Sequence, residues 1–296
     1  MHSRGEKMRT ICRRDFLGVM AGAASVAATG MRVQASEKPR FQIGACDWSL
    51  RATCRLEALE VAHQIGLDGV QVSFKTVEDG LDLRLPEVRQ SYQETGRKLG
   101  VQICSLAMGG LNRVPLATSD EAERWVRECI EVMPLLGQKV VLLAFFGNAD
   151  LRGKPELQDR LVERLRRLAP LAEKAGVFLA IESTLDAEGH LRILRAVDSP
   201  ALRVYYDMLN MVHQGYDPYE DMRKLGGELI CEIHCKESDT VLGRGRLDFP
   251  RIKAILDDWD WSGWLVLEGA VDKSLGLVES YKQNAAYLRK VFLGES

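Results

Sequence analysis

Four side chains with the chemistry of metal ligands each close a short apolar run in the second half of the sequence. They are Glu182, Asp207, His234 and Glu268. In a parallel barrel the carboxyl ends of the strands converge on one face, so four such residues can surround one small volume. Three carboxylates and one imidazole suit one divalent cation of the Mn, Mg, Co or Zn type. The repeated placement therefore predicts a metal centre made by these four residues.

Eight strand-like runs alternate with amphipathic stretches from residue 41 onward. The runs cover residues 41–48, 69–74, 101–107, 139–146, 177–183, 202–208, 229–236 and 264–269, and the clearest helical stretches cover 55–65, 86–99, 119–136 and 155–175. This alternation predicts a single-domain α/β fold, the (β/α)8 TIM barrel. An open doubly wound sheet is the alternative, but it usually carries a glycine-rich loop after the first strand, and residues 47–51 contain no glycine.

Helix boundaries are marked by glycines and by one capping motif. Each of the four helical stretches ends just before a glycine, the residue that most readily takes the left-handed conformation at a helix end; the four are Gly66, Gly100, Gly137 and Gly176. Thr118 is followed three residues later by Glu121, the spacing of a capping box. We therefore expect a helix to begin at Thr118.

Strand parity predicts which side chains enter the barrel. Side chains alternate between the two faces of a strand, so an inward Glu182 implies an inward Ala180. The same rule points Arg203 and Glu232, on the next two strands, into the barrel. A buried unpaired charge is costly, so we expect these two to form an ion pair beneath the metal ligands.

Residues 1–35 have the features of an export signal. The pair Arg13-Arg14 is followed by Phe16-Leu17, a weakly apolar stretch of small residues and a cleavage-like Val33-Gln-Ala35. This order resembles a twin-arginine signal. We expect residues 1–35 to be that signal, residues 36–296 to be the barrel domain, and the protein to be exported to the periplasm.

Composition narrows the classes of partner. The chain is 46% hydrophobic and 28% charged with a net charge of −2, which gives no reason to expect nucleic-acid binding. After the signal no apolar run approaches a membrane-spanning length, so we expect no stable membrane insertion. The sequence leaves the oligomeric state open, a homo-oligomer included. Of the six cysteines after residue 35, Cys231 and Cys235 have the opposite parity to His234 and are expected to pack toward the helices.

Several motifs resemble those of a known family. They are Ile181-Glu-Ser, Tyr206-Asp-Met-Leu-Asn210, Ile233-His-Cys-Lys-Glu237, Gly243-Arg-Gly-Arg-Leu-Asp-Phe249 and Leu267-Glu-Gly. Over about residues 41–293 the chain resembles the sugar phosphate isomerase/epimerase family, the xylose isomerase-like TIM barrels. In its keto-sugar epimerase branch the positions matching Glu182, Asp207, His234 and Glu268 bind one divalent metal. The resemblance also implies that Glu182 and Glu268 are catalytic and move protons on opposite faces of the substrate.

The resemblance carries over to the substrate pocket only in part. Glu188 lies six residues after Glu182, where the epimerases also have a substrate-binding glutamate. Asn210 stands where they have a second histidine, and Thr240 falls near the place of an arginine. Endonuclease IV, another member of the family, fits poorly because it needs a histidine-rich trinuclear zinc site and this chain has 5 histidines.

Three further residues are candidates for contact with a substrate. Lys236 follows His234 closely and can reach a substrate oxygen, His190 follows a strand end, and Trp48 ends the first strand, where an indole can stack on a sugar face. Core packing is the other interpretation of Trp48, and a solvated lysine the other interpretation of Lys236.

These observations predict a divalent-metal-dependent isomerase or epimerase that acts on a small sugar or keto-sugar through an enediolate. A lyase is the alternative, because the same enolate can expel a leaving group from a keto-glycoside. A free-sugar isomerase needs a closed pocket, whereas the lyase needs one that admits an aglycone. A non-catalytic sugar-binding module would not need the four ligands intact. Phosphorylated substrates are disfavoured if the protein leaves the cytoplasm.

Overall fold

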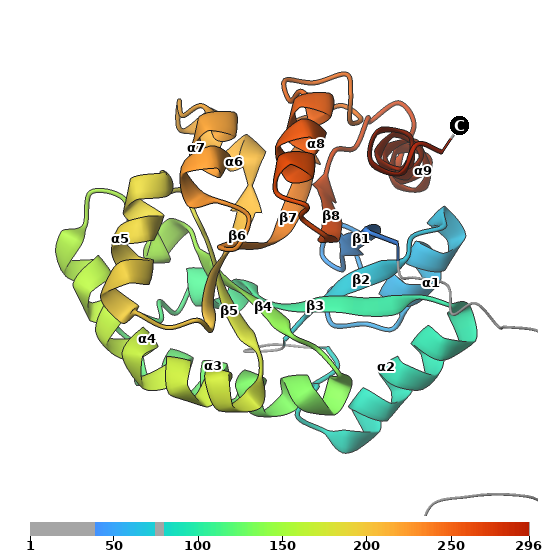
Figure 1. The fold of residues 1–296 in the computed structure, drawn as a ribbon. Coiled ribbons are helices and arrows are strands. Elements are labelled where there is room, and N and C mark those ends of the chain that lie inside the picture. The colour runs from blue at the N-terminus through green and yellow to red at the C-terminus, as the bar shows by residue number, and fades with distance from the viewer. Residues whose placement is uncertain (1–38, 75–79, 296) are drawn as a thin grey trace, which may run out of the picture. The chain divides into compact units, whose positions relative to one another are not determined.

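Eight parallel strands close into a barrel in the computed structural model, which describes residues 39–74 and 80–295 (Figure 1). Strands that are neighbours in the chain are neighbours in the barrel, and the last strand pairs with the first. The strands are β1 (Phe41–Cys46), β2 (Gly69–Ser73), β3 (Gln102–Met108), β4 (Val140–Phe145), β5 (Phe178–Ser183), β6 (Leu202–Asp207), β7 (Ile230–Glu237) and β8 (Gly263–Gly269). Every strand end lies within two residues of its predicted place, and the predicted single (β/α)8 domain is confirmed.

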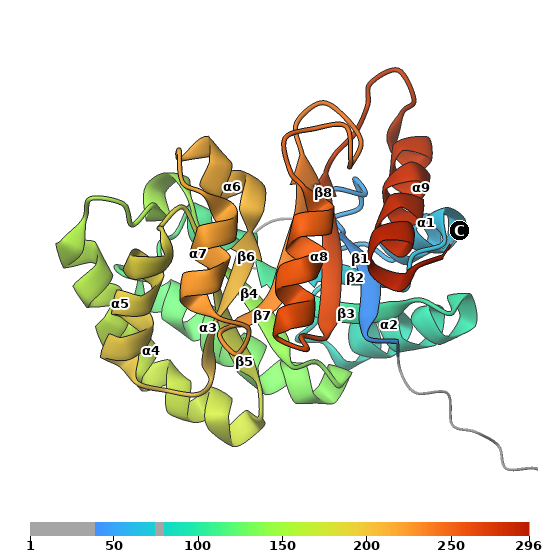
Figure 2. The same ribbon diagram turned by 45° about the horizontal axis from the view of Figure 1, so that its top comes forward.

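Helices surround the strands on the outside (Figures 1 and 2). They are α1 (Glu57–Ile65), α2 (Pro86–Leu99), α3 (Asp120–Val132), α4 (Pro155–Ala175), α5 (Ala187–Val197), α6 (Met208–His213), α7 (Pro218–Leu225), α8 (Phe249–Asp258) and α9 (Leu277–Leu288). Short helical turns add η1 (Gly109–Asn112), η2 (Met133–Leu136), η3 (Gly147–Ala149) and η4 (Arg289–Leu293).

The core has two layers separated by the strands. On β5, Leu179 and Ile181 pack toward the helices, whereas Ala180 packs inside the barrel with Leu142 and Tyr205. Burial on both faces explains why the strands are almost continuously apolar, and why a polar residue within one of them stands out. The parity predicted for β5 is confirmed.

The helix ends follow the glycines that the sequence offers. Gly66, Gly100, Gly137 and Gly176 all adopt positive φ, between 68° and 89°, directly after their helices. The predicted start of α3 is wrong by one residue. The hydroxyl of Ser119, not that of Thr118, accepts the hydrogen bond from the backbone N–H of Ala122, at 3.2 Å.

A bulge between β6 and β7 changes the side-chain directions at the start of β7. Val204 pairs with Ile230 and Tyr205 with Glu232, so Cys231 is an extra residue in the ladder. Cys231 therefore packs against the interior of the barrel, and its predicted direction toward the helices is wrong. Cys235, beyond the bulge, packs in the outer layer as predicted.

The predicted ion pair between Arg203 and Glu232 is wrong. Arg203 lies beside Ala180 in register, and its guanidinium stacks over the ring of Phe178 at 5.0 Å. Glu232 lies one level higher, beside Tyr205, fully buried. Because Asp207 pairs with His234, Glu232 lies two residues further along the barrel than Arg203, and no ion pair joins the two side chains in the described part of the chain. Burial raises the pKa of Glu232 to about 8, with the nearby hydroxyls of Ser105 and Tyr205 partly opposing the rise.

The N-terminal predictions, the membrane prediction and the cysteines have different outcomes. Residues 1–35, the predicted export signal, lie outside the described residues, so the signal and its cleavage site remain predictions. None of the described helices combines the length and the apolar composition that crossing a bilayer requires. The six described cysteines are all free thiols.

Candidate active site

The four predicted ligands meet at the carboxyl ends of four consecutive strands. Glu182 comes from β5, Asp207 from β6, His234 from β7 and Glu268 from β8. Each offers one ligand atom, and these atoms all lie within 4.8 Å of one another. Glu182, Asp207 and His234 are buried, and Glu268 is partly exposed. This is the face of the barrel on which enzymes of this architecture place their active sites.

His234 is the centre of the cluster. Its Nδ1 lies 2.9 Å from an oxygen of Glu182, 3.5 Å from one of Glu268 and 3.9 Å from one of Asp207. All three carboxylates therefore face the same ring nitrogen. The charges of Glu182 and Glu268 raise the pKa of His234 to about 9, although burial alone would lower it.

Asp207 tests whether a cation fits the cluster. Its Oδ1 accepts a hydrogen bond from the backbone N–H of Asn210, at 2.9 Å, and so caps the first turn of α6. Its Oδ2 is buried and has no hydrogen-bond partner, while the other three groups surround it. Burial raises the pKa of Asp207; the charge of Lys236 partly opposes the rise, and the charges of Glu268 and Glu182 add to it. A buried carboxylate oxygen that accepts no hydrogen bond and lies beside two more carboxylates is what a divalent cation would satisfy.

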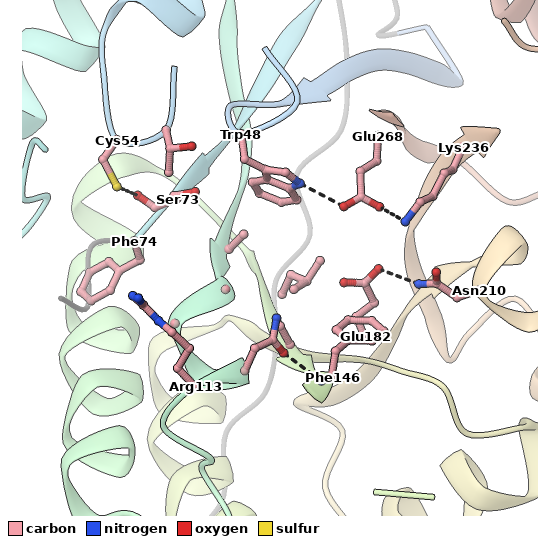
Figure 3. A pocket seen from close by; sticks show the side chains of 17 residues that line it. Trp48, Cys54, Ser73, Phe74, Arg113, Phe146, Glu182, Asn210, Lys236 and Glu268 are labelled. Carbon is pink, nitrogen blue, oxygen red and sulfur yellow. Dashed lines mark hydrogen bonds and ion pairs between the residues drawn. The ribbon is translucent and has the colours of Figure 1, made fainter. Parts of the chain in front are cut away.

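Glu268 is held from two sides. Trp48 Nε1 donates to Oε1 at 2.9 Å, and Lys236 Nζ donates to Oε2 at 2.8 Å (Figure 3). Lys236 also lies 3.5 Å from Oδ2 of Asp207. Although burial opposes it, the charges of His234 and Lys236 hold the pKa of Glu268 below its usual range. The site thus combines three carboxylates with two cationic side chains.

A layer of buried polar groups from β1–β3 supports the imidazole from the other side. His234 Nε2 lies 3.1 Å from Oε1 of Gln71 and 3.4 Å from Sγ of Cys46. Gln71 Nε2 in turn donates to the hydroxyl of Ser105 at 3.0 Å. The sequence analysis missed Gln71 and Ser105. The available signal was their polarity at mid-strand, in runs that are otherwise apolar.

A cavity of about 430 Å³ opens beside the cluster. Glu182, Glu268, Lys236 and Asn210 line one side of it. The opposite side comes from β1–β4 and their loops, and contributes Trp48, Thr53, Cys54, Ser73, Phe74, Ala107, Gly109, Gly110, Asn112, Arg113, Leu142, Ala144 and Phe146. Figure 3 shows the two glutamates together on one side, with Phe74 and Arg113 across the cavity. Asp207 and His234 lie behind the glutamates and do not line the cavity.

Three of the five predicted substrate contacts lie on the cavity wall. They are Trp48, Asn210 and Lys236. Asn210 Nδ2 approaches Oε1 of Glu182 at 3.5 Å, so it lies beside a predicted catalytic group.

The other two lie elsewhere, and neither belongs to the cavity wall. Glu188 is exposed on the first turn of α5 and pairs with Arg195 at 4.0 Å. His190 is buried, with Nε2 3.0 Å from the hydroxyl of Ser183 and Nδ1 3.0 Å from the carbonyl oxygen of Asp186. Burial lowers the pKa of His190 to about 4. In this structure His190 connects the end of β5 to α5.

Comparison with known proteins identifies the family. Residues 59–291 match the family described as xylose isomerase-like TIM barrel. The chain belongs to this family.

Two relatives of known activity are each 25% identical to the chain. One is the 2-epi-5-epi-valiolone 7-phosphate 2-epimerase of an Actinoplanes species, matched over 68% of this chain and 74% of the relative. The other is the L-ribulose-5-phosphate 3-epimerase UlaE of Escherichia coli, matched over 73% of this chain and 82% of the relative.

Solved structures share the fold. A xylose isomerase domain protein from Planctomyces limnophilus superposes with a TM-score of 0.70 at 21% identity, covering 88% of this chain and 100% of that one. A xylose isomerase-like TIM barrel protein from Mycobacterium smegmatis, in complex with magnesium, has a TM-score of 0.65 at 17% identity and covers 81% of this chain and 88% of that one.

Proposed function

We propose that this protein is a divalent-metal-dependent epimerase or isomerase of keto-sugars. The proposal rests on which members of the cluster line the cavity. Four ligand groups converge, yet only Glu182 and Glu268 also face the cavity. These two can therefore act on a bound substrate, while Asp207 and His234 lie behind them. Membership of a family whose relatives include sugar epimerases supports the same reaction class.

Glu182, Asp207, His234 and Glu268 would hold the cation. The donor set of three carboxylates and one imidazole suits Mn, Mg, Co or Zn. A cation bound there would supply positive charge beside the substrate carbonyl and its neighbouring hydroxyl, which offsets the charge of an enediolate. A protein with the same fold has been solved in complex with magnesium, which supports a divalent cation as the cofactor.

Proton transfer falls to the two glutamates. One carboxylate removes the proton from the carbon beside the carbonyl, and the electron pair of that C–H bond forms the enediolate. The other glutamate, from a different strand, returns a proton to the opposite face and so inverts the carbon. Lys236, whose pKa is raised by the charges of Asp207 and Glu268 despite its burial, remains an ammonium group that can donate to a substrate oxygen.

The substrate class follows from the expected location. The twin-arginine pattern in residues 1–35 favours a periplasmic protein, which would meet free sugars. The two relatives are named for phosphorylated substrates. We propose a free keto-sugar for this chain, and phosphorylated and free substrates should be tested side by side.

The lyase stays as the second candidate because the cavity extends beyond the cluster. The wall opposite the glutamates includes the small residues Ala107, Gly109 and Gly110, and the whole cavity has a volume of about 430 Å³. The aglycone of a keto-glycoside, which elimination would release, would lie against this wall. The two reactions differ in their products, since elimination yields two molecules and epimerisation one.

The test is the exchange of carbon-bound hydrogen of a keto-sugar in deuterated water. NMR monitors the exchange, and the protein is loaded with each of the four metals in turn. We expect metal-dependent deuterium incorporation into a keto-sugar, and loss of it in Glu182→Gln and in Glu268→Gln. Glu188→Gln, an exposed glutamate outside the cavity, is the matched control and should retain exchange. Undiminished exchange in both cavity variants would contradict the two-glutamate mechanism, and release of a second molecule would favour the lyase.

A further inference from the structure

The imidazole of His234 has two different neighbourhoods. Nδ1 faces the three carboxylates, and Nε2 faces the amide of Gln71 at 3.1 Å. Gln71 and Ser105 are both completely buried and come from β2 and β3, on the other side of the barrel interior from β7. Neither residue lines the cavity, so neither can touch a substrate there.

The directions of the hydrogen bonds are consistent along this chain of groups. The Gln71 amide nitrogen donates to the Ser105 hydroxyl at 3.0 Å, which leaves the amide oxygen turned toward His234. The thiol of Cys46 also donates to that oxygen, at 3.4 Å. An oxygen in this place can only accept a hydrogen bond, so it requires a proton on Nε2.

We propose that Gln71, fixed by Ser105, is a positioning residue that keeps the proton of His234 on Nε2 and so leaves Nδ1 free to bind the cation. A neutral imidazole carries one proton, and the nitrogen that ligates a metal must be the other one. The inference rests on the proposed metal site and adds to it a support from strands that supply no ligand.

The opposite orientation of the Gln71 amide would prevent Nδ1 of His234 from binding the cation. A Gln71 amide nitrogen turned toward His234 would favour a bare Nε2 and a proton on Nδ1, the nitrogen that faces the three carboxylates. Ser105 opposes this rotation because its hydroxyl donates its own proton to Sγ of Cys104, at 3.9 Å, and is therefore left to accept from the amide nitrogen. Ser105 therefore acts on the cation two hydrogen bonds away from it.

The experiment measures manganese affinity by calorimetry in the full chain and three variants. Gln71→Leu has a similar volume and no acceptor, and we expect its dissociation constant to rise about 10- to 100-fold. Gln71→Glu restores an acceptor oxygen and should recover most of the affinity. Gln158→Leu removes a buried glutamine of α4 that bonds to the carbonyl oxygen of Leu151, in the loop before α4, and to Arg192 on α5; this variant should bind manganese like the wild type.

A second readout separates positioning from general damage to the fold. In the zinc-loaded wild type with 15N-labelled histidine, we expect one slowly exchanging Nε2–H signal that disappears in Gln71→Leu. Thermal unfolding with a chelator present shows whether each variant is folded, and Ser105→Ala provides a smaller change with the same expected direction if Gln71→Leu does not fold.

Three results would overturn the inference. Equal manganese affinity in the wild type and in Gln71→Leu would remove the role of Gln71 and leave the metal site intact. Failure of Gln71→Glu to recover affinity would show that volume or packing, not the acceptor, matters. If the folded wild type binds none of the four metals, the proposed metal site fails together with this inference.

Discussion

The two halves of the barrel rim differ in their chemistry. The strands β5–β8 end in Glu182, Asp207, His234 and Glu268, and they also supply Lys236 to the cavity. The described cavity residues that come from β1–β4 and their loops are mostly apolar, small or neutral, with one charged side chain, Arg113. On the proposed function, one half would hold the reactive groups and the other would shape the space for the substrate.

This difference separates two properties that an enzyme must combine. Changes in the β5–β8 half should alter cation binding and the chemical step, whereas changes in the β1–β4 half should alter which substrates fit. Gln71 and Ser105 are the exception, because they belong to β2 and β3 yet support His234 from below the cavity.

The largest effect is expected for Asp207→Asn, in the charged half. Loss of a ligand should weaken manganese binding at least about 100-fold, the upper end of what loss of a supporting residue costs. The apo protein should unfold at the same or a higher temperature, because burial and the neighbouring glutamates already disfavour the ionised carboxylate. Calorimetry and thermal unfolding with a chelator measure the two quantities.

Asp221→Asn is the control for this prediction. Asp221 is another buried carboxylate with a raised pKa, about 6, and accepts a hydrogen bond from the backbone N–H of Ala187, away from the cluster. It should leave manganese affinity unchanged. An Asp207→Asn protein that binds manganese normally would break the assignment of this half as the cation site.

A smaller effect is expected for Ala144→Leu, in the shaping half. Ala144 lies on β4 directly beside Glu182 and lines the cavity, so the larger side chain fills space that a substrate would occupy. We expect KM to rise about 10-fold, within the usual energetic cost of overpacking. Manganese affinity should not change. A matching loss of manganese affinity would show that the two halves are not separable.

The smallest effect at neutral pH is expected at His190, which is buried just outside the cavity. Its folded pKa is about 4, below the ordinary value of 6.5, so in the folded state the neutral form is favoured. Above pH 6.5 neither state binds a proton there and stability is unaffected. As the pH falls below 6.5, His190 binds a proton in the unfolded chain but not in the folded chain. The free energy of unfolding therefore decreases by up to about 3 kcal/mol near pH 4.

His190→Gln should remove this part of the pH dependence. Urea unfolding at pH 7 and pH 4.5 should show a smaller loss of stability in the variant than in the wild type. Ser183→Ala is the matched control, since it removes the hydroxyl that contacts Nε2 but keeps the titrating ring. Parallel losses in the wild type and His190→Gln would show that His190 does not titrate in this way.

The sequence predicted the strands and the convergence of the ligands for the same physical reason. Each of Glu182, Asp207, His234 and Glu268 interrupts an apolar run at its end, and parallel strands bring their ends together. Residues close together in the sequence were therefore enough to predict the site. The helix ends at Gly66 and Gly176 were also predictable from neighbouring residues, because glycine readily adopts the left-handed conformation found at many helix ends.

What the sequence did not predict depends on register between strands. Arg203 and Glu232 have the right parity to enter the barrel, but the pairing of Asp207 with His234 sets Glu232 beside Tyr205, two residues beyond Arg203. No pattern within either strand reveals that register, nor the extra residue at Cys231. Gln71 and Ser105 were missed for a related reason, since their importance comes from facing His234 across the interior, more than a hundred residues away in the chain.

The pairing of β8 with β1 also determines at which stage of folding the site is completed. All four ligands lie between residues 182 and 268, and Glu268 is held by Trp48, 220 positions earlier in the chain. Translation delivers the N-terminal strands first, and contacts of such long sequence separation form late. If the proposed function holds, we therefore expect cation capture to be among the last events in the maturation of this protein, because a nascent chain lacking β8 has no complete set of ligands.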